Sequence, residues 1–284
     1  MDEQQSFDSF WAYAKERLDS NGLMNWNYDE QGNLKGTSAA TDADEDMAMA
    51  LIFADTKWGG KNYHEDALAL CRNIMLHEVE ADTFVLKPGD AWGGSACTDI
   101  SYFSPAAYKI FAEFSGDKNW LKVADKCYEI IAAARNKGTY LVPDWCTAQG
   151  THSYEAETSQ GSTVDYYYYE ALRCPIRLSW DYLWFGDKRA KEQLTGMTSF
   201  FNSIGAANIK AGYTLYGLNT IGSWHDTAFV AAAAAGAMGG GNLDFARSCF
   251  SEMKKNKSNH YYEDSVRIFA LLVTSGNFPD LYHY

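Results

Sequence analysis

The sequence predicts an all-helical protein built from antiparallel helix pairs. Apolar residues recur at helical spacing from one end of the chain to the other, and the alternation typical of strands is nearly absent. Short turns such as Ser115–Asn119 alternate with long loops such as Ala81–Ser104 and Lys137–Thr163. Stacked helix pairs with their long loops gathered at one end form an α/α toroid, and this is the architecture we expect.

The helical pattern can be followed in order along the chain. It begins near the N-terminus with Phe7, Phe10, Trp11, Tyr13 and Ala14 and continues over Asp44–Asp55. Gly, Asn, Asp or Pro residues separate the later stretches, which we expect over 62–78, 104–115, 118–136, 164–182, 187–203, 224–238, 242–255 and 261–275. The sequence therefore predicts roughly ten helices.

The length and composition favour one domain over residues 1–284. A chain of 284 residues with 46% hydrophobic residues can bury one substantial core. The polar stretch Thr158–Thr163 is too short to separate two cores and is expected to be a surface loop.

The charge and the aromatic content narrow the class of partner. A formal net charge of −13 would repel nucleic acid, so an uncharged polymer fits better than an anionic one. Aromatic residues make up 15% of the chain, with nine Trp and nineteen Tyr. Both a large aromatic core and a sugar-binding cleft lined with rings would explain that number.

Cysteines and termini give no sign of a metal, a cofactor or a membrane anchor. The six cysteines form no C-x-x-C pair, so we expect buried hydrophobic thiols and no metal or cofactor: Cys71, Cys97, Cys127, Cys146, Cys174 and Cys249. Their pairing is not determined by the sequence. The opening residues MDEQQSFDSF lack the basic and apolar regions of a signal peptide, and no run approaches eighteen apolar residues.

One segment carries a specific resemblance. The run ATDADEDMAMALIFA over Ala40–Ala54, closed by Trp58, resembles the signature of family 8 glycoside hydrolases. Further matching blocks follow in the family's order, namely Asn21–Met24 with Trp26, Leu86–Asp90 with Trp92, Ser101–Phe103, Val142–Trp145 and Trp184–Asp187. The resemblance implies a helical (α/α)6 barrel, an endo-acting β-1,4-glucanase of the cellulase-like branch, and inversion at the cleaved bond.

The signature segment has both a structural and a catalytic interpretation. Thr41 or Asp42 can cap the following helix, whose first turn favours acidic side chains. By the resemblance, however, Asp42 matches the aspartate that holds the sugar at the cleavage point, and Asp44 matches a supporting acid. Glu45 and Asp46 fit equally well as solvated acids of the first turn.

A second acidic position follows from the resemblance. The family's general base is an aspartate in a Tyr-Asp-Ala-x-Arg setting, and the matching run Tyr169–Arg173 carries Glu170 in its place. Glu170 is the expected base, with Arg173 orienting it; Glu155 and Glu157 of the preceding loop are the alternatives. The longer glutamate side chain moves its oxygens by about an ångström, enough to weaken activity.

Aromatic residues at family subsite positions are candidates for sugar stacking, with packing in the core as the alternative for each: Trp26, Trp92, Tyr102 and Tyr169. Because the family is bacterial and secreted, the same is expected of this protein. Activity on a related xylan, lichenan or chitosan remains open.

The family's general acid, a glutamate in a Ser-Glu-Gly-x-Gly-Tyr stretch, has no match in the sequence. We therefore expect an incomplete (α/α)5 barrel of five helix pairs with an open gap. Three alternatives follow: a glucan-binding pseudoenzyme, a homo-oligomer in which a second copy covers the gap, or another acid reaching it, with His64, Glu65, His225 and Asp226 as candidates.

Overall fold

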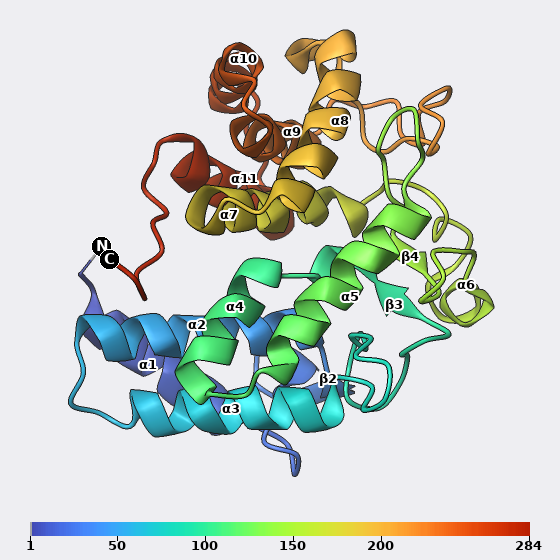
Figure 1. Ribbon diagram of the computed structural model, residues 1–284. Coiled ribbons are helices and arrows are strands. Elements are labelled where there is room, and N and C mark those ends of the chain that lie inside the picture. Colours follow the sequence, from blue (N-terminus) through green and yellow to red (C-terminus); the bar gives the residue numbers. More distant parts are fainter. Residues whose placement is uncertain (1) are drawn as a thin grey trace. The chain divides into compact units, whose positions relative to one another are not determined.

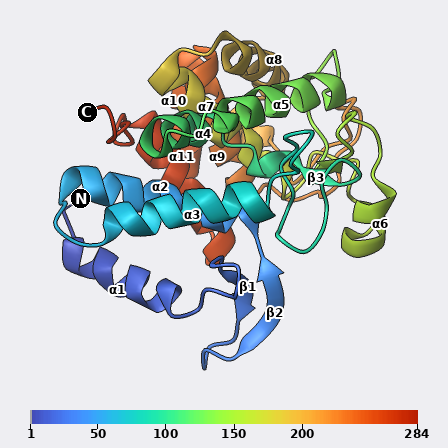
Figure 2. The ribbon, with the colours of Figure 1, turned by 60° about the horizontal axis from the view of Figure 1, so that its bottom comes forward.

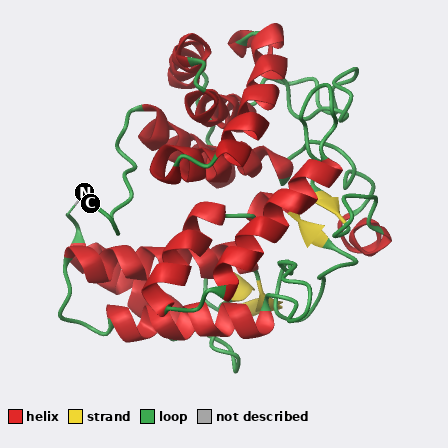
Figure 3. Cartoon of the chain, in the orientation of Figure 1, coloured by secondary structure: helices red, strands yellow, loops and turns green. Residues whose placement is uncertain are grey.

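The computed structural model describes residues 2–284, and helices and loops make up almost all of it (Figure 3). The chain forms two compact units. Unit 1 contains the residues up to Ser95, Ala107–Val123 and Asp280–Tyr284, and unit 2 contains Ala96–Ala106 and Ala124–Pro279. Two of the boundaries fall inside α4 (Pro105–Ser115) and α5 (Asn119–Ala134), and the others follow Ser95 and Pro279.

Unit 1 opens with three helices, α1 (Gln4–Lys15), α2 (Thr41–Lys57) and α3 (Tyr63–His77). The helices α2 and α3 pack side by side (Figure 2), and the buried face of α2 is formed by residues such as Ala48, Leu51 and Ile52. α1 is tied to α3 by Asp66, which accepts hydrogen bonds from the Trp11 indole at 2.8 Å and the Lys15 amine at 2.7 Å. The three helices are therefore held together through α3.

A short hairpin leads into α2. Its strands, β1 (Asn25–Tyr28) and β2 (Leu34–Ala39), pair antiparallel, with Asn25 opposite Ala39 and Tyr28 opposite Leu34 (Figure 2). The register is irregular between these pairs. Because β2 ends one residue before α2 begins at Thr41, the hairpin fixes where that helix starts.

Unit 2 is organised around α9 (Thr227–Gly240), which packs against α7 (Cys174–Phe185), α8 (Lys188–Ile204), α10 (Leu243–Lys255) and α11 (Tyr261–Thr274) (Figure 1). The α9 sequence TAFVAAAAAGAMGG is almost entirely buried. Alanine and glycine let four helices approach its backbone closely, and alanine also has the best helix propensity.

The remaining elements of unit 2 are short. The two-residue strands β3 (Thr98–Asp99) and β4 (Trp145–Cys146) pair antiparallel. The helix α6 (Tyr154–Gln160) starts at Ser153, whose hydroxyl accepts a hydrogen bond from the Ala156 N–H. Three 3₁₀ turns complete the unit: η1 (Ile100–Tyr102), η2 (Ala171–Arg173) and η3 (Ala206–Asn208).

The all-helical prediction is confirmed, with eleven α-helices among residues 2–284 against the ten expected. The helix expected over 164–182 is wrong in its first half, because residues 164–170 form turns and α7 begins only at Cys174. The prediction also missed α6 and four strands. α6, β3 and β4 lie inside segments expected to be loops, and β1 and β2 lie between the first two expected helices. Elements this short have too little periodicity to be recognised.

The prediction that the cysteines are buried thiols is confirmed, since all six are free and buried. Burial raises the pKa of Cys71, Cys174 and Cys249 to about 12, which keeps these thiols protonated at neutral pH. No helix in the part of the chain that the structure describes is long and apolar enough to cross a membrane.

Candidate active site

The first turn of α2 carries the signature acids of unit 1. The cap position is Ala40, whose methyl side chain cannot form a cap hydrogen bond, so the prediction that Thr41 or Asp42 occupies it is wrong. Thr41 instead donates its hydroxyl to the Lys87 carbonyl at 2.8 Å. Asp42 is partly exposed and accepts a hydrogen bond from the Ala43 N–H at 3.0 Å. Its carboxylate therefore satisfies one helix-end donor and still reaches solvent.

Asp44 and its neighbours form a buried acidic layer beneath Asp42. Asp44 is fully buried and accepts a hydrogen bond from the Met24 N–H at 3.0 Å. Burial, reinforced by the charges of Asp19, Asp42 and Asp90, raises the pKa of Asp44 to about 8. Burial and the charge of Asp44 also raise the pKa of Glu78 well above its usual range. Asp44 is thus largely protonated at neutral pH.

The interpretation of Glu45 as a solvated acid of the first turn is wrong. Its side chain is fully buried, and the Tyr108 hydroxyl donates to Glu45 Oε1 at 2.6 Å. Tyr108 in turn stacks on Trp120, with ring centroids 5.5 Å apart. Glu45 therefore belongs to the packing between α2 and α4, whereas Asp46 is partly exposed.

Trp26 presents an open aromatic surface in unit 1. It lies on β1 and is 61% exposed. On β2, a Cβ atom at Gly36 would lie 2.2 Å from Trp26 Nε1, so the indole rests directly on the glycine backbone. A large exposed indole on a rigid support is an arrangement that suits stacking on a sugar ring better than core packing.

Trp92 follows a tight turn that packs on the start of α2. A Cβ atom at Gly89 would lie 2.3 Å from the Ala39 carbonyl oxygen and 3.3 Å from Trp92 Nε1, so only glycine fits there. Gly89 and Trp92 also pair through a β-bridge. Trp92 is partly exposed, and its turn is therefore anchored to the same backbone that leads to Asp42.

Unit 2 holds Glu170 against Arg173. The two side chains form an ion pair, and Arg173 Nη2 also donates to Ser101 Oγ at 2.8 Å and lies 3.9 Å from Asp99 Oδ2. The Glu170 side chain is 35% exposed. The Arg173 guanidinium lies 5.3 Å from the centre of the Tyr102 ring. Arg173 thus orients a partly exposed carboxylate and covers one side of an aromatic ring.

The segment carrying Glu170 is fixed by a buried aspartate. Asp144 Oδ1 accepts hydrogen bonds from the Tyr168 and Ala171 N–H groups, each at 2.8 Å. Although these bonds favour the charged form, burial raises the pKa of Asp144 well above its usual range. Asp144 explains why 164–170 is not helical, since its side chain holds backbone donors in a turn.

Tyr169 is joined to Asp226 and Tyr262. Its hydroxyl donates to Asp226 Oδ2 at 2.6 Å, and its carbonyl accepts a hydrogen bond from the Tyr262 hydroxyl. Asp226 Oδ1 accepts from the Ala228 N–H at 2.8 Å at the start of α9. Tyr169 is partly exposed, so it can offer a ring to a ligand while its hydroxyl stays anchored.

The alternative acids lie in separate surroundings. Glu155 and Glu157 are exposed on α6, and Glu157 lies 3.4 Å from His152 Nε2. His64 and Glu65 are exposed at the start of α3, where His64 pairs with Asp55 at 2.9 Å. His225 Nδ1 contacts the Ile209 carbonyl at 2.6 Å, and its Nε2 lies 3.4 Å from Glu252. The remaining candidate, Asp226, differs from them because it accepts a hydrogen bond from the Tyr169 hydroxyl.

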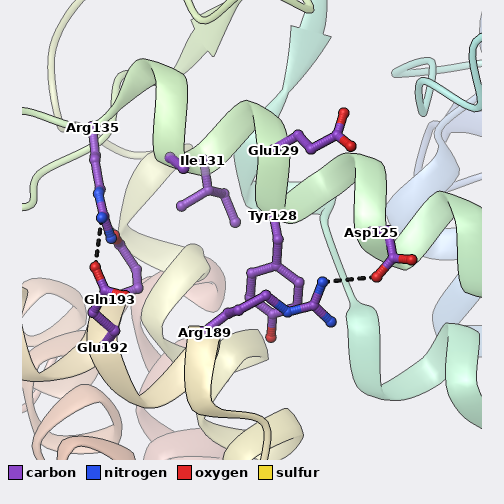
Figure 4. Close-up of a pocket in the computed structure, with 9 residues that line it drawn as sticks. Asp125, Tyr128, Glu129, Ile131, Arg135, Arg189, Glu192 and Gln193 are labelled. Carbon is purple, nitrogen blue, oxygen red and sulfur yellow. Dashed lines mark hydrogen bonds and ion pairs between the residues drawn. The ribbon is translucent and has the colours of Figure 1, made fainter.

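A pocket of about 450 Å³ lies elsewhere in unit 2, lined by side chains of α5 and α8 (Figure 4). Four of its charged groups form two ion pairs: Arg189 Nη1 with Asp125 at 2.7 Å, and Arg135 Nη2 with Glu192 at 2.6 Å (Figure 4). None of the predicted site residues lines it. The candidate site residues instead lie in two clusters, one around Asp42 in unit 1 and one around Glu170 in unit 2.

Sequence reasoning missed three residues that shape these clusters: Asp90, Asp144 and Tyr262. Asp90 and Asp144 fall inside blocks that resemble the family, so the sequence marked both positions but did not indicate what either residue does. Tyr262 gave no signal, because its contact with Tyr169 joins residues 93 positions apart.

Carboxylates placed beside exposed aromatic rings are typical of proteins that bind or cleave carbohydrates. The family model described as glycosyl hydrolases family 8 matches residues 1–276. The chain belongs to this family.

Its relatives are similar over almost the whole chain. Endoglucanase 2 of Ruminiclostridium josui is 47% identical over 99% of this chain and 62% of its own length. Endoglucanase A of Acetivibrio thermocellus is 44% identical over 98% of this chain and 59% of its own length. A β-1,3-1,4-glucanase structure from Paenibacillus sp. X4 matches with a TM-score of 0.90 and 33% identity, over 98% of this chain and 78% of that one. The chain thus spans about three fifths of the length of these curated relatives.

Proposed function

We propose that this chain carries the catalytic domain of an endo-acting β-1,4-glucanase that cleaves cellulose-type glucans with inversion. The observation that carries the proposal is Asp42, held partly exposed at the start of α2 in the unit that also presents the Trp26 indole to solvent. The names of the relatives from Ruminiclostridium josui and Acetivibrio thermocellus support the choice of an endoglucanase.

In this proposal the two acidic positions have different roles. Asp42 binds the sugar at the cleavage point, where its charge stabilises the developing oxocarbenium ion. Glu170 accepts the proton of the attacking water, and this requires a carboxylate. The leaving sugar oxygen takes up a proton from solvent, since the family's general acid has no match in the sequence. Its ion pair with Arg173 favours that form and limits its rotation. Asp44, buried and largely protonated, supports the Asp42 turn without contacting the sugar.

The aromatic residues bind successive sugar units. Trp26 and Trp92 provide stacking surfaces in unit 1, and Tyr102 and Tyr169 do so in unit 2. An uncharged glucan is compatible with the net charge of −13, since its binding needs no positive surface.

We also propose that residues 1–284 form one catalytic domain, and the match of a single family model to residues 1–276 supports this. One cooperative transition in calorimetry is expected, with the van't Hoff and calorimetric enthalpies equal. Two separate transitions would assign the units to two domains.

An insoluble polymer is degraded outside the cell, so the proposed substrate implies a secreted bacterial protein. The bacterial origin of the relatives supports this location. It is tested by searching culture medium for the protein with an antibody.

Mixed-linkage glucan is the second candidate substrate, since the similar structure from Paenibacillus sp. X4 is a β-1,3-1,4-glucanase. Comparing kcat/KM on cellopentaose and on barley β-glucan separates the two preferences.

The proposal is tested by reducing-end release from carboxymethyl cellulose, with Glu170→Gln as the key variant. Glu170→Gln should lower turnover at least about a hundredfold, because a general base contributes that much. Glu155→Gln and Glu157→Gln are matched controls on α6 and should stay near the native rate. An equal loss in either control would move the base to α6. Glucan binding without reducing-end release in the native protein would instead identify a glucan-binding pseudoenzyme.

A further inference from the structure

Asp90 lies where three segments of unit 1 meet. Its Oδ1 atom accepts hydrogen bonds from the Ser38 hydroxyl at 2.8 Å and the Ala39 N–H at 2.9 Å, at the end of β2. Its Oδ2 atom accepts one from the Asn21 side chain at 2.8 Å. Asp90 itself belongs to the turn that leads to Trp92. One side chain therefore joins the segment before β1, the end of β2 and the Trp92 turn.

The backbone of Ser38, next to this junction, has an unfavourable conformation. Ser38 has φ of 83°, a left-handed conformation that side chains other than glycine rarely adopt. Asp90 Oδ1 binds both the Ser38 hydroxyl and the N–H of the next residue. The unfavourable conformation is thus maintained by Asp90, and it directs the chain from β2 into α2 four residues before Asp42.

The Trp92 turn is docked on the same backbone by further contacts. The Thr41 N–H donates to the Pro88 carbonyl at 3.3 Å, and the Thr41 hydroxyl donates to the Lys87 carbonyl. Lys87 Nζ closes the turn by donating to the Asp90 carbonyl at 2.8 Å. Since Gly89 leaves no room for a Cβ atom against Ala39, the two segments touch backbone to backbone.

The Asn21 link reaches the strand that carries Trp26. Asp19 Oδ1 accepts from the Asn21 and Leu23 N–H groups at 2.8 and 3.1 Å, so the loop holding Asn21 is itself well ordered. That loop leads directly into β1, where the Trp26 indole lies on Gly36. Asp90 can therefore transmit a fixed geometry to three candidate site residues.

We propose that Asp90 is a positioning residue that sets Asp42, Trp26 and Trp92 in one geometry for the glucan chain. The inference rests on the proposed function for the roles of these three residues. Asp90 acts through its two oxygens, with Oδ1 fixing the entry to α2 and Oδ2 fixing the entry to β1. Partial burial raises the pKa of Asp90, but hydrogen bonds from Ala39, Ser38 and Asn21 outweigh it and keep the pKa below its usual value. Both carboxylate oxygens therefore remain acceptors.

The test exchanges donor and acceptor at the Asn21 contact. Asp90→Asn keeps the size of the side chain and an oxygen for Ser38 and Ala39, but it brings two amide donors together at Asn21. Because small displacements of reacting groups are costly, kcat on cellopentaose should fall about tenfold or more. Adding Asn21→Asp restores a donor opposite an acceptor, so the double variant should return to within about threefold of native.

A control in the same hairpin separates positioning from general stability. Asp29 accepts bonds from the Gln31 and Asn33 N–H groups at 3.0 and 2.8 Å at the tip of the hairpin, away from Asp90. Asp29→Asn should lower the melting temperature slightly and leave kcat unchanged. Asp90→Asn with native kcat, or a double variant that regains its melting temperature without its kcat, would overturn the proposal.

The indole resonances of Trp26 and Trp92 provide a readout independent of cleavage. In ¹H–¹⁵N spectra both should shift in Asp90→Asn and return in the double variant. Native positions in Asp90→Asn would overturn the positioning role. If the native protein cleaves no glucan, the proposed function fails, and the indole shifts still decide whether Asp90 sets the geometry.

Discussion

Asp42 and Asp44 stand two residues apart in the first turn of α2, yet their surroundings give them opposite properties. Asp42 reaches solvent and meets the helix N-terminus, which favours a charged carboxylate. Asp44 points into a layer shared with Glu78, where burial raises its pKa to about 8. The spacing TDAD thus supplies one exposed charge and one buried, largely neutral acid from a single turn.

Replacing Asp42 by asparagine should remove at least about two orders of magnitude of turnover while leaving the fold intact. The amide oxygen still accepts from the Ala43 N–H, so the melting temperature should stay near native. Asp46→Asn, four residues further along α2, is the matched control. Near-native turnover in Asp42→Asn would refute the catalytic role.

From the raised pKa of the buried Asp44 we predict how the stability of the protein depends on pH. Because its pKa is higher in the folded protein than the value of about 4 when unfolded, folding takes up a proton between these values, and stability falls as pH rises from about 4 to 8. The slope contributed by this one group reaches about 1.4 kcal/mol per pH unit. Asp44→Asn cannot ionise and keeps an acceptor for the Met24 N–H, so its stability should fall less steeply.

Urea unfolding at pH 5, 6, 7 and 8 measures this difference. Glu78, whose pKa is also raised, should leave part of the slope in Asp44→Asn. Parallel profiles for the native protein and the variant would show that Asp44 is charged in the folded state.

At the scale of elements, α9 shows how small residues build the core of unit 2. Two of its three glycines, Gly236 and Gly239, have different surroundings. At Gly239 a Cβ atom would lie 3.1 Å from the Ser179 Cα and 2.5 Å from a Leu194 methyl carbon, whereas at Gly236 the nearest atom is the Pro175 Cβ at 3.2 Å. The first contact involves the backbone of α7, which cannot move aside.

Gly239→Ala should therefore destabilise the protein by about 1–3 kcal/mol in spite of the better helix propensity of alanine. Gly236→Ala should stay within about 1 kcal/mol of native, because crowding and propensity oppose each other there. Urea unfolding of both variants measures the difference. A Gly239→Ala protein at least as stable as Gly236→Ala would contradict the packing described for α9.

The elements that the sequence predicted well are those with long periodic patterns, such as α2, α3 and α8. Residues 164–170 were wrongly expected to be helical, because Asp144 fixes the backbone at Tyr168 and Ala171 from 24 and 27 positions away. Asp42 was identifiable because its neighbours form a motif. The contacts by which Asp90 and Tyr262 support the candidate site residues could not be identified from the sequence, because they join residues that are far apart along the chain.

At the scale of the whole molecule, a family 8 chain carries a net charge of −13 and presents aromatic rings beside acidic groups. The charge favours solubility, and an uncharged glucan is bound through ring stacking and hydrogen bonds instead of ionic contacts. Binding to cello-oligosaccharides should therefore depend little on salt.

The stereochemistry of the first product tests the central claim most directly. Inversion at a β-linkage by water activated at Glu170 forms a new reducing end in the α configuration. Proton NMR during the first minutes of cellopentaose hydrolysis, before mutarotation, should show the α-anomer signal rising first. A β-anomer signal rising first would contradict inversion and the role of Glu170 as a base.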